Sequence, residues 1–313
     1  KNTQFDIRFQ KTFNIKPRPS DIDSKTKYDK DGVLYITNDE YNLAQYALSN
    51  LIGGIGYWYG DQIYELESNK PSKTDPMTLY SAVPCRSFFP RGFLWDEGFH
   101  QLLISKWDID LSINIISSWL NNMDKNGWIP REQILGDESR DRVPKEFQVQ
   151  KPYIANPPTL FLAIHSLYNQ YSTNNDETCT ADVCYIESEL VHQFLNKYWD
   201  KLVLHFKWYI NTQTSPYDKN SFRWRGREKD HNLPSGLDDY PRHINITDLE
   251  GHIDIHCWMI KLYRTMSDLA KFLGKNTLSI EWQNMGILLT KKLDEFHYDK
   301  NTNSYQDYII LNN

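Results

Sequence analysis

The chain has 313 residues, a net charge of −6 and a sequence pI of about 5.9. This acidic balance, with Lys and Arg scattered along the chain, argues against nucleic acid as the main partner. No apolar run approaches the roughly 20 residues that span a bilayer, so we expect any membrane attachment to come from a segment outside this chain. The sequence begins at Lys1 with neither Met nor a signal peptide, which favours a piece of a longer protein over a cytosolic one.

The predicted elements are almost all helical. Residues 1–38 are polar and rich in turn formers, and we expect an extended linker or lead-in there. A helical pattern then begins at Asn38 or Asp39 and ends at a glycine cluster, residues 53–56. Further helical periodicities cover about 97–107, 109–124, 157–171, 186–205, 248–273 and 277–297. Because strand-like alternation is scarce, residues 39–313 are predicted to form an all-α domain of stacked helical hairpins, with long loops at one end that hold the chemistry.

The four cysteines are too few for a disulfide scaffold. Cys179 and Cys184 could close a local loop in an oxidising compartment, or could equally be free thiols. Cys257 falls within a helical pattern and is expected in the core. None of the cysteines has His partners at zinc spacing, so we expect neither a metal nor a cofactor. The one glycosylation sequon, at Asn245, is a weak signal.

The stretch from Arg86 to His100 combines two arginines, several aromatic residues and a Trp-Asp-Glu run. Aromatic faces suit the C–H face of a pyranose ring, and charged groups form strong hydrogen bonds to its hydroxyls. A sugar-binding groove therefore accounts for this mixture. The alternative is a buried aromatic loop in which Arg91 pairs with Asp96. Taken alone, the stretch leaves the two interpretations about equally open.

A tight loop is predicted after Pro234, where Gly236 permits unusual backbone angles. Such a loop can present Asp238 and Asp239 to a cleft, one as a protonated acid and the other as a supporting group. The commoner alternative is an Asp-rich surface turn or a helix cap. A basic aromatic segment, residues 223–227, precedes the loop.

Two further carboxylates, Glu250 and Asp254, are four residues apart and would share one face of a helix. Like charges at that spacing need partners, such as the nearby arginines or a bound sugar. Upstream, Arg131 and Glu132 lie in a rigid loop flanked by proline. The alternative for that loop is a turn held by an Arg–Glu pair at the surface.

Taken together and in this order, these segments resemble glycoside hydrolase family 63, over roughly residues 40 to 310. The resemblance implies an (α/α)6 toroid and an inverting exo-α-glucosidase. Such an enzyme removes the terminal α-1,2-linked glucose from the glucosylated high-mannose N-glycan precursor in the endoplasmic reticulum lumen. Two alternatives are a glycan-binding or structural toroid fragment without hydrolytic activity and, less favoured, a trehalase-like glycosidase. The matching segments are residues 47–57, 86–100, 127–138, 235–242 and 250–258.

The resemblance also implies roles for single residues. Asp238 holds the position of the general acid, with Asp239, Glu250 and Asp254 as supporting carboxylates. The positions that match sugar subsites are Phe89, Phe93, Trp95, Asp96 and Arg131, to which we add Glu132, Trp224 and Arg225 as candidate substrate-binding residues.

In this family the general base is a glutamate far beyond the acid, near the end of the toroid. Because the chain ends before such a position, we expect the base to lie outside it and the toroid to be incomplete at its C-terminal end. The family's upstream β-sandwich and membrane anchor are expected outside the chain as well. An open toroid would expose apolar side chains such as Ile287, Leu288 and Leu293. We therefore expect the chain alone to be marginally stable or prone to aggregate unless a partner segment covers them.

Overall fold

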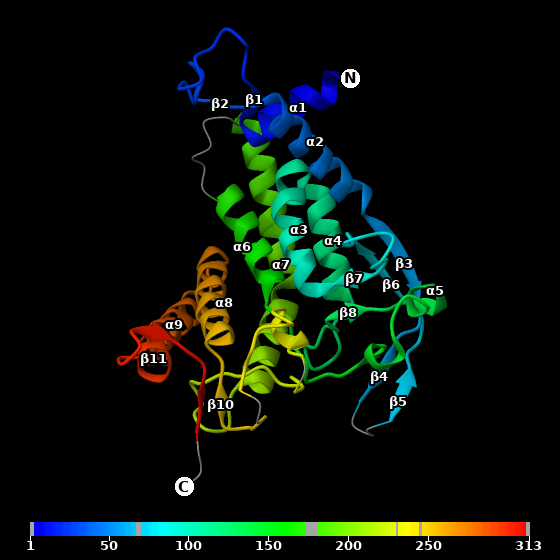
Figure 1. Ribbon diagram of the computed structural model, residues 1–313, viewed down its shortest axis with the longest axis vertical. Helices are drawn as coiled ribbons and strands as arrows, with labels where there is room; N and C mark the ends of the chain where they lie inside the picture. Colours follow the sequence, from blue (N-terminus) through cyan, green and yellow to red (C-terminus); the bar gives the residue numbers. More distant parts are fainter. Residues whose placement is uncertain (1–2, 67–69, 173–180, 230, 244–245, 311–313) are drawn as a thin grey trace.

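The computed structural model describes residues 3–66, 70–172, 181–229, 231–243 and 246–310 (Figure 1). Helices dominate these residues, and their strands form only short two- and three-stranded sheets. The mostly helical architecture is thereby confirmed, while its arrangement as a toroid stays a prediction. Cys179, the side chain of Cys184, and Asn245 lie outside the described residues.

Each predicted helical segment is present. The capping box at Thr37 fixes the start of α2, because its hydroxyl accepts a hydrogen bond from the Glu40 amide while the Glu40 carboxylate accepts from the Thr37 amide. Asp108 ends α3 and caps α4 by accepting a hydrogen bond from the Leu111 amide. The helices are α2 (Asn38–Gly53), α3 (Leu94–Trp107), α4 (Ile109–Asn121), α6 (Thr159–Ser172), α7 (Ala181–Gln213), α8 (Ile253–Phe272) and α9 (Asn276–His297).

One hydrophobic core runs through most of the molecule. Helices α3, α4, α6 and α7 pack together, and α6 also contacts α8, which pairs with α9 (Figure 1). Ile104, Trp119 and Leu195 contribute fully buried side chains from α3, α4 and α7, and Met266 does so from α8. None of the helices in the described ranges is long and apolar enough to cross a membrane.

The N-terminal residues are more structured than the extended lead-in predicted for residues 1–38. They form α1 (Thr3–Phe13) and then β1 (Ile15–Pro17), which pairs in parallel with β2 (Leu34–Ile36). Phe5, Phe9 and Phe13 recur at a spacing of four residues, so they share one helix face. That face packs on α2 and α3, where the Phe9 ring meets Tyr41 and the Phe5 ring meets Trp107. The prediction of an extended segment is therefore wrong, while the domain boundary at residue 38 stays a prediction.

Short paired strands fold the long loops, which the sequence had indicated as irregular. They are β3 (Gly56–Gly60) with β6 (Met77–Ser81); β4 (Ile63–Glu65) with β5 (Pro71–Lys73) and β9 (Val149–Gln150); β7 (Gly92–Phe93) with β8 (Glu132–Gln133); β10 (Glu250–Gly251) with β13 (Tyr308–Ile309); and β11 (Tyr298–Asp299) with β12 (Ser304–Tyr305). Three short helical turns lie in the same loops: α5 (Gly136–Arg140), η1 (Lys145–Phe147) and η2 (Leu233–Ser235).

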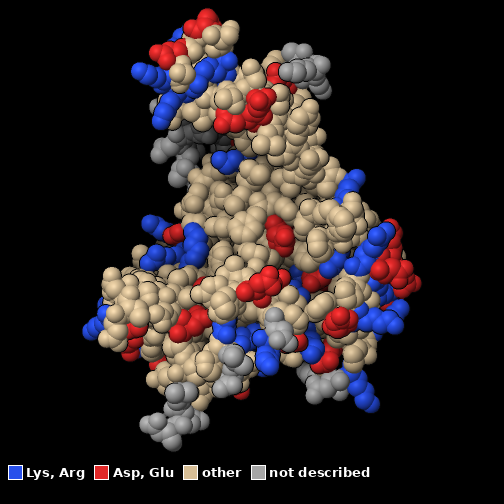
Figure 2. All heavy atoms as spheres, viewed as in Figure 1, with Lys and Arg blue, Asp and Glu red and all other residues tan. Residues whose placement is uncertain are grey.

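Charged side chains are unevenly spread over the face seen in Figure 2. They gather over the lower half, where the loops lie, and at the N-terminal tip, with acidic and basic groups intermixed. The part of this face that covers helices α3 and α4 is largely uncharged.

Candidate active site

A pocket of about 350 Å³ opens where three of the predicted segments meet. The first segment contributes aromatic rings, the second an Arg–Glu pair and the third the loop after η2. The predicted site residues that line it are Phe89, Phe93, Trp95, Asp96, Arg131, Glu132 and Asp238. Residues more than 140 positions apart in the sequence are therefore neighbours in the fold.

The pairing of β7 with β8 joins the first two segments. Phe93 lies opposite Glu132 in this antiparallel ladder, and the Leu94 amide donates a hydrogen bond to the Arg131 carbonyl at 2.9 Å. Helix α3 begins directly after β7, so Trp95 and Asp96 occupy its first turn. This strand-to-helix junction sets aromatic and acidic side chains beside the Arg–Glu pair.

The loop that carries Asp238 is fixed by its own hydrogen bonds and by Asn156. The Asn156 side-chain amide donates to the carbonyl oxygens of Leu233 and Pro234, each at 3.0 Å. The Asn232 amide donates to the Asp238 carbonyl at 3.0 Å, which closes the loop. These bonds give the acidic residue a defined place at the mouth of the pocket.

Gly236 allows this loop to lie against the pocket wall. Its φ of +72° is in the left-handed region, and a Cβ atom there would come within 2.6 Å of the Trp95 ring. Only glycine satisfies both the backbone angle and the close approach. The turn predicted from Gly236 is therefore present, and it packs directly on a predicted sugar-stacking residue.

Asp238 is exposed at the mouth of the pocket, yet it does not behave as a free carboxyl. Partial burial against the pocket wall raises its pKa above the usual 3.8. The positive charge of Arg131 opposes this shift, while the negative charges of Asp239 and Glu132 add to it. A raised pKa favours the protonated form that a general acid needs.

Glu132 is buried between two arginines. Arg91 donates from Nε to Glu132 Oε2 at 2.8 Å, and Arg131 approaches Oε1 from Nη2 at 3.0 Å. The Arg91 guanidinium also lies 4.5 Å from the centre of the Phe93 ring. The alternative in which Arg91 pairs with Asp96 is therefore wrong, and so is the alternative of a surface Arg–Glu pair, because Glu132 is only 4% exposed.

Asp96 is the second pocket carboxyl with a raised pKa. Burial is the main cause, a nearby His100 opposes it, and the negative charges of Glu97 and Glu132 add to it. Asp96 and Asp238 thus share one pocket and both favour protonation more than a free carboxyl does. Such groups both donate and accept hydrogen bonds, which suits the hydroxyls of a sugar.

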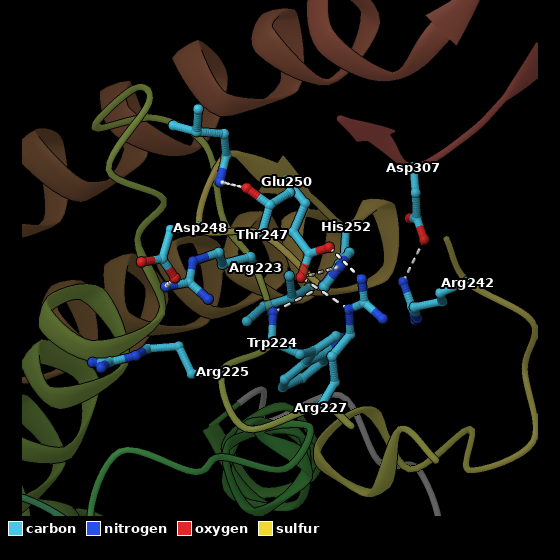
Figure 3. A network of polar contacts seen from close by, with 12 residues as sticks. Arg223, Trp224, Arg225, Arg227, Arg242, Thr247, Asp248, Glu250, His252 and Asp307 are labelled. Carbon is cyan, nitrogen blue, oxygen red and sulfur yellow. Dashed lines mark hydrogen bonds and ion pairs between the residues drawn. The ribbon is translucent and has the colours of Figure 1, made fainter. Parts of the chain in front are cut away.

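Glu250 lies away from the pocket, in a buried ion pair (Figure 3). Arg227 donates from Nε to Oε1 at 2.9 Å and from Nη2 to Oε2 at 2.5 Å, and His252 Nε2 lies 3.5 Å from Oε1. Burial alone would raise the Glu250 pKa, but His252 and Arg227 outweigh it and lower the pKa to about 2. This carboxylate is therefore ionised and fully engaged near neutral pH.

Asp254 has its own arginine. Arg242 donates from Nη2 to Asp254 and from Nη1 to Asp307, both at 2.6 Å. The expectation that Glu250 and Asp254 need arginine partners is confirmed. The expectation of a shared helix face is wrong, because Glu250 belongs to β10 and α8 begins only at Ile253.

Besides Glu250 and Asp254, three further predicted residues do not line the pocket. Trp224 is fully buried in the core, so it offers no ring face to a sugar, and its predicted substrate contact is withdrawn. The Arg225 guanidinium lies over the Tyr153 ring, 5.0 Å from its centre, and points away from Glu250 (Figure 3). Asp239 is exposed and acts on the pocket through its charge.

The structure adds pocket residues that the sequence did not nominate. Arg91 and Phe147 line it, as does Asn156, which also holds the loop that carries Asp238. Asn156 had a signal in its Asn-Pro-Pro run, whereas nothing in the local pattern marked Phe147.

Cys257, expected in the core, is exposed. Within the described ranges, no group of three or more His, Cys, Asp or Glu side chains could hold a metal ion.

Comparisons with known proteins match the chain over almost its whole length. The model described as "Glycosyl hydrolase family 63 C-terminal domain" matches residues 1–313. The chain is 38% identical to "Mannosyl-oligosaccharide glucosidase GCS1" of Arabidopsis thaliana and 35% identical to "Alpha-glucosidase 2" of the same plant. It is 33% identical to "Mannosyl-oligosaccharide glucosidase" of Saccharomyces cerevisiae. Each alignment covers 98% of this chain but only 35%, 38% and 41% of the respective relative.

Proposed function

This chain belongs to glycoside hydrolase family 63, and from that premise we propose that it carries the glucose pocket and general acid of an inverting exo-α-glucosidase. The proposed reaction removes the terminal α-1,2-linked glucose from the glucosylated high-mannose N-glycan precursor. We place this step of N-glycan processing in the endoplasmic reticulum lumen. The observation that carries the proposal is the single pocket in which Asp238 meets aromatic walls and an Arg–Glu pair.

The pocket suits one sugar ring. Its volume of about 350 Å³ lies near the lower end of the roughly 300–1,000 Å³ typical of small-molecule sites. Phe93 and Trp95 offer apolar surface to the C–H face of glucose, and Phe89 stands beside them, half-exposed. Asp96 and Arg131 offer polar groups to its hydroxyls. Because Glu132 is held by two arginines, it fixes Arg131 in place for that contact.

In the proposed reaction, protonated Asp238 gives its proton to the glycosidic oxygen. The bond between that oxygen and the anomeric carbon breaks, and its electron pair stays on the departing oxygen. A water molecule attacks the anomeric carbon from the opposite face and loses its proton to a second carboxylate. The released glucose therefore has inverted configuration.

The second carboxylate of an inverting pair lies roughly 6.5–9.5 Å from the first. Glu250 and Asp254 are each held by an arginine and do not line the pocket, so we assign them to anchoring the loops that carry Arg227 and Arg242. That the general base lies outside residues 1–313 stays a prediction from the family resemblance.

Substitution of the acid tests this proposal in the full natural protein that contains these residues. Loss of one hexose from a triglucosylated high-mannose glycan, followed by mass spectrometry, reports turnover. Asp238→Asn should lower kcat by roughly 10²–10⁴-fold because proton donation is lost. Asp239→Asn is the matched control and should keep most of the activity. Near-normal turnover by Asp238→Asn would refute the assignment, and preferential cleavage of trehalose would favour the trehalase-like alternative.

A further inference from the structure

A groove of about 480 Å³ lies between α4 and α7. It shares no lining residue with the pocket around Asp238. Thr78 adds to its wall from β6, the strand that packs along α4 (Figure 1). None of the described residues that line this groove was among the predicted site residues, so its chemistry is a separate question.

The sequence places uncharged polar side chains on the face of α4 that lines the groove. They recur at a spacing of three or four residues, so they share one side of the helix, while the opposite side is apolar and buried in the core. Gln193 and Tyr198 face them from α7. The polar residues from α4 are Asn114, Ser117, Ser118 and Asn121.

Charge is almost absent from this groove. Although 24% of the chain is charged, Lys197 is the only charged side chain among the described residues that line it. Its ammonium group lies over the Tyr198 ring, 5.2 Å from the centre. A phosphate or a nucleic acid would need several basic groups, and a basic peptide would need acidic ones. The lining therefore suits a neutral ligand that both donates and accepts hydrogen bonds.

Hydrogen bonds hold several of these polar groups in place. The Asn121 side-chain amide donates to the Tyr198 hydroxyl at 3.4 Å, and the Lys201 ammonium donates to the Asn121 side-chain oxygen at 3.0 Å. The Asn122 side chain donates to the Thr78 carbonyl at 2.8 Å. Tyr198 is only 5% exposed. Groups fixed in this way lose little conformational freedom when a ligand binds, so the wall is already organised.

Two exposed tyrosines extend the groove onto the sheet formed by β3 and β6. In this antiparallel ladder Tyr59 lies opposite Thr78, and Tyr57 lies opposite Tyr80. Directly opposed residues share one face of a sheet, so Tyr59 stands beside the wall that Thr78 forms. Tyr57 and Tyr59 are 67% and 64% exposed. Their free aromatic faces suit the C–H face of a sugar ring, as the rings in the first pocket do.

We propose that this groove is a second carbohydrate-binding site, separate from the catalytic pocket, for a neutral oligosaccharide of hexose units. Tyr59 stacks on one sugar ring. Asn114, which has no hydrogen-bond partner among the described residues, binds hydroxyls of the next ring. The site takes no part in bond cleavage and goes beyond the proposed function. Only the source of the oligosaccharide, a mannose arm of the high-mannose glycan, rests on that function.

Binding of two small sugars to the full natural protein tests the inference, with Asp238→Asn present throughout to prevent turnover. The probes are α-1,2-linked mannotriose and methyl α-glucoside, titrated by NMR. The double variant Tyr59→Ala, Asn114→Ala should weaken mannotriose binding about tenfold, because one stacking contact and one hydrogen bond are lost. It should leave the affinity for methyl α-glucoside unchanged. Trp95→Ala should have the opposite effect, since it alters the first pocket alone.

A matched control makes the same chemical changes on α2. Tyr46→Ala with Asn50→Ala removes an exposed tyrosine and an exposed asparagine outside both sites, and should keep both affinities.

Four outcomes would overturn the inference alone, provided that methyl α-glucoside still binds. They are a parent that does not bind mannotriose, a groove variant that binds it as well as the parent, an equal loss in the control, and a neutral Gly-Ser peptide that binds in place of the sugar. Failure of the parent to bind methyl α-glucoside would instead count against the proposed glucose pocket, and the mannotriose comparison would still decide the groove.

Discussion

At the scale of single residues, the neighbouring carboxyls Asp238 and Asp239 have different surroundings. Asp238 lines the pocket and has a raised pKa, whereas Asp239 lies outside and contributes a negative charge to it. A general acid works only while it is protonated. Activity should therefore fall as the pH rises through the Asp238 pKa, and the basic limb of the kcat/KM profile reports that group.

Asp239→Asn should move this basic limb to lower pH. The substitution removes a negative charge that helps to raise the Asp238 pKa, so the acid loses its proton at a lower pH. The acidic limb should stay in place, and Glu138→Gln should leave both limbs unchanged. The measurement is kcat/KM against pH in the full natural protein, and a basic limb that moved to higher pH would contradict the assignment.

Gly236→Ala should damage the site more than the fold. A left-handed backbone costs a residue with a Cβ atom roughly 1–2 kcal/mol, and the new methyl group would also press on the Trp95 ring. Gly274 is a matched control, since its φ is +70° and a Cβ atom there would meet nothing within 4 Å. Both Ala variants should lose unfolding free energy in denaturant titrations, Gly236→Ala more than Gly274→Ala because of the contact with Trp95. Only Gly236→Ala should lose affinity for methyl α-glucoside, and equal affinities would argue against a pocket built on this contact.

At the scale of elements, ion pairs join loop segments to the elements that follow them in the chain. Arg227 follows Trp224 in the loop before the acid, and its partner Glu250 lies in β10. Because the Glu250 pKa is lowered from 4.5 to about 2, the folded protein binds fewer protons there than the unfolded chain in this range. The stability from this pair is therefore complete above about pH 4.5 and is lost as the pH falls toward 2.

Glu250→Gln should remove this acid dependence and destabilise the protein near neutral pH. A buried Arg227 without its carboxylate costs about 3 kcal/mol of unfolding free energy. Urea unfolding at stepped pH measures both effects, with Glu138→Gln as the exposed control. If the unfolding free energy of the variant at pH 7 matched that of the parent, the ion pair would not anchor these loops.

The sequence predicts some of these elements well and others poorly. Helices such as α8 carry long apolar periodicity, so their existence follows from spacing alone. The two-residue strands β7 and β8 carry no such signal, yet their pairing brings Phe93 beside Glu132. The placement of Trp224 was wrong because an aromatic residue among arginines has the same local pattern in a core as in a sugar site. The distinction depends on tertiary packing, which local sequence does not contain.

At the scale of the whole molecule, the family-63 resemblance drawn from ordered motifs is confirmed along the full chain. The order of the motifs identified the family because it combines several segments that are far apart in the sequence. It could not give the side-chain partners, since Arg91, Asp96 and Glu132 all line one pocket and Arg91 pairs with Glu132. The toroid and the placement of the general base stay predictions from the family.

The apolar flank on α9 should limit the solubility of this chain alone. Ile280, Ile287 and Leu288 are 59%, 49% and 38% exposed, and Leu293 is partly buried, so the predicted exposure holds for Ile287 and Leu288. Contiguous exposed apolar surface favours association. Light scattering of the chain at rising concentration should show self-association, which Ile280→Lys with Ile287→Lys reduces. A monodisperse parent with a sharp, cooperative melt would contradict this prediction.

The most direct test of the central claim compares two glycans that differ only in their glucose cap. Equilibrium binding of the chain carrying Asp238→Asn is measured with a triglucosylated high-mannose glycan and with the same glycan lacking glucose. The account predicts clear preference for the glucosylated glycan, and loss of that preference when Trp95→Ala removes a wall of the pocket. Equal binding of the two glycans by a folded chain, or a preference that survives Trp95→Ala, would contradict the account.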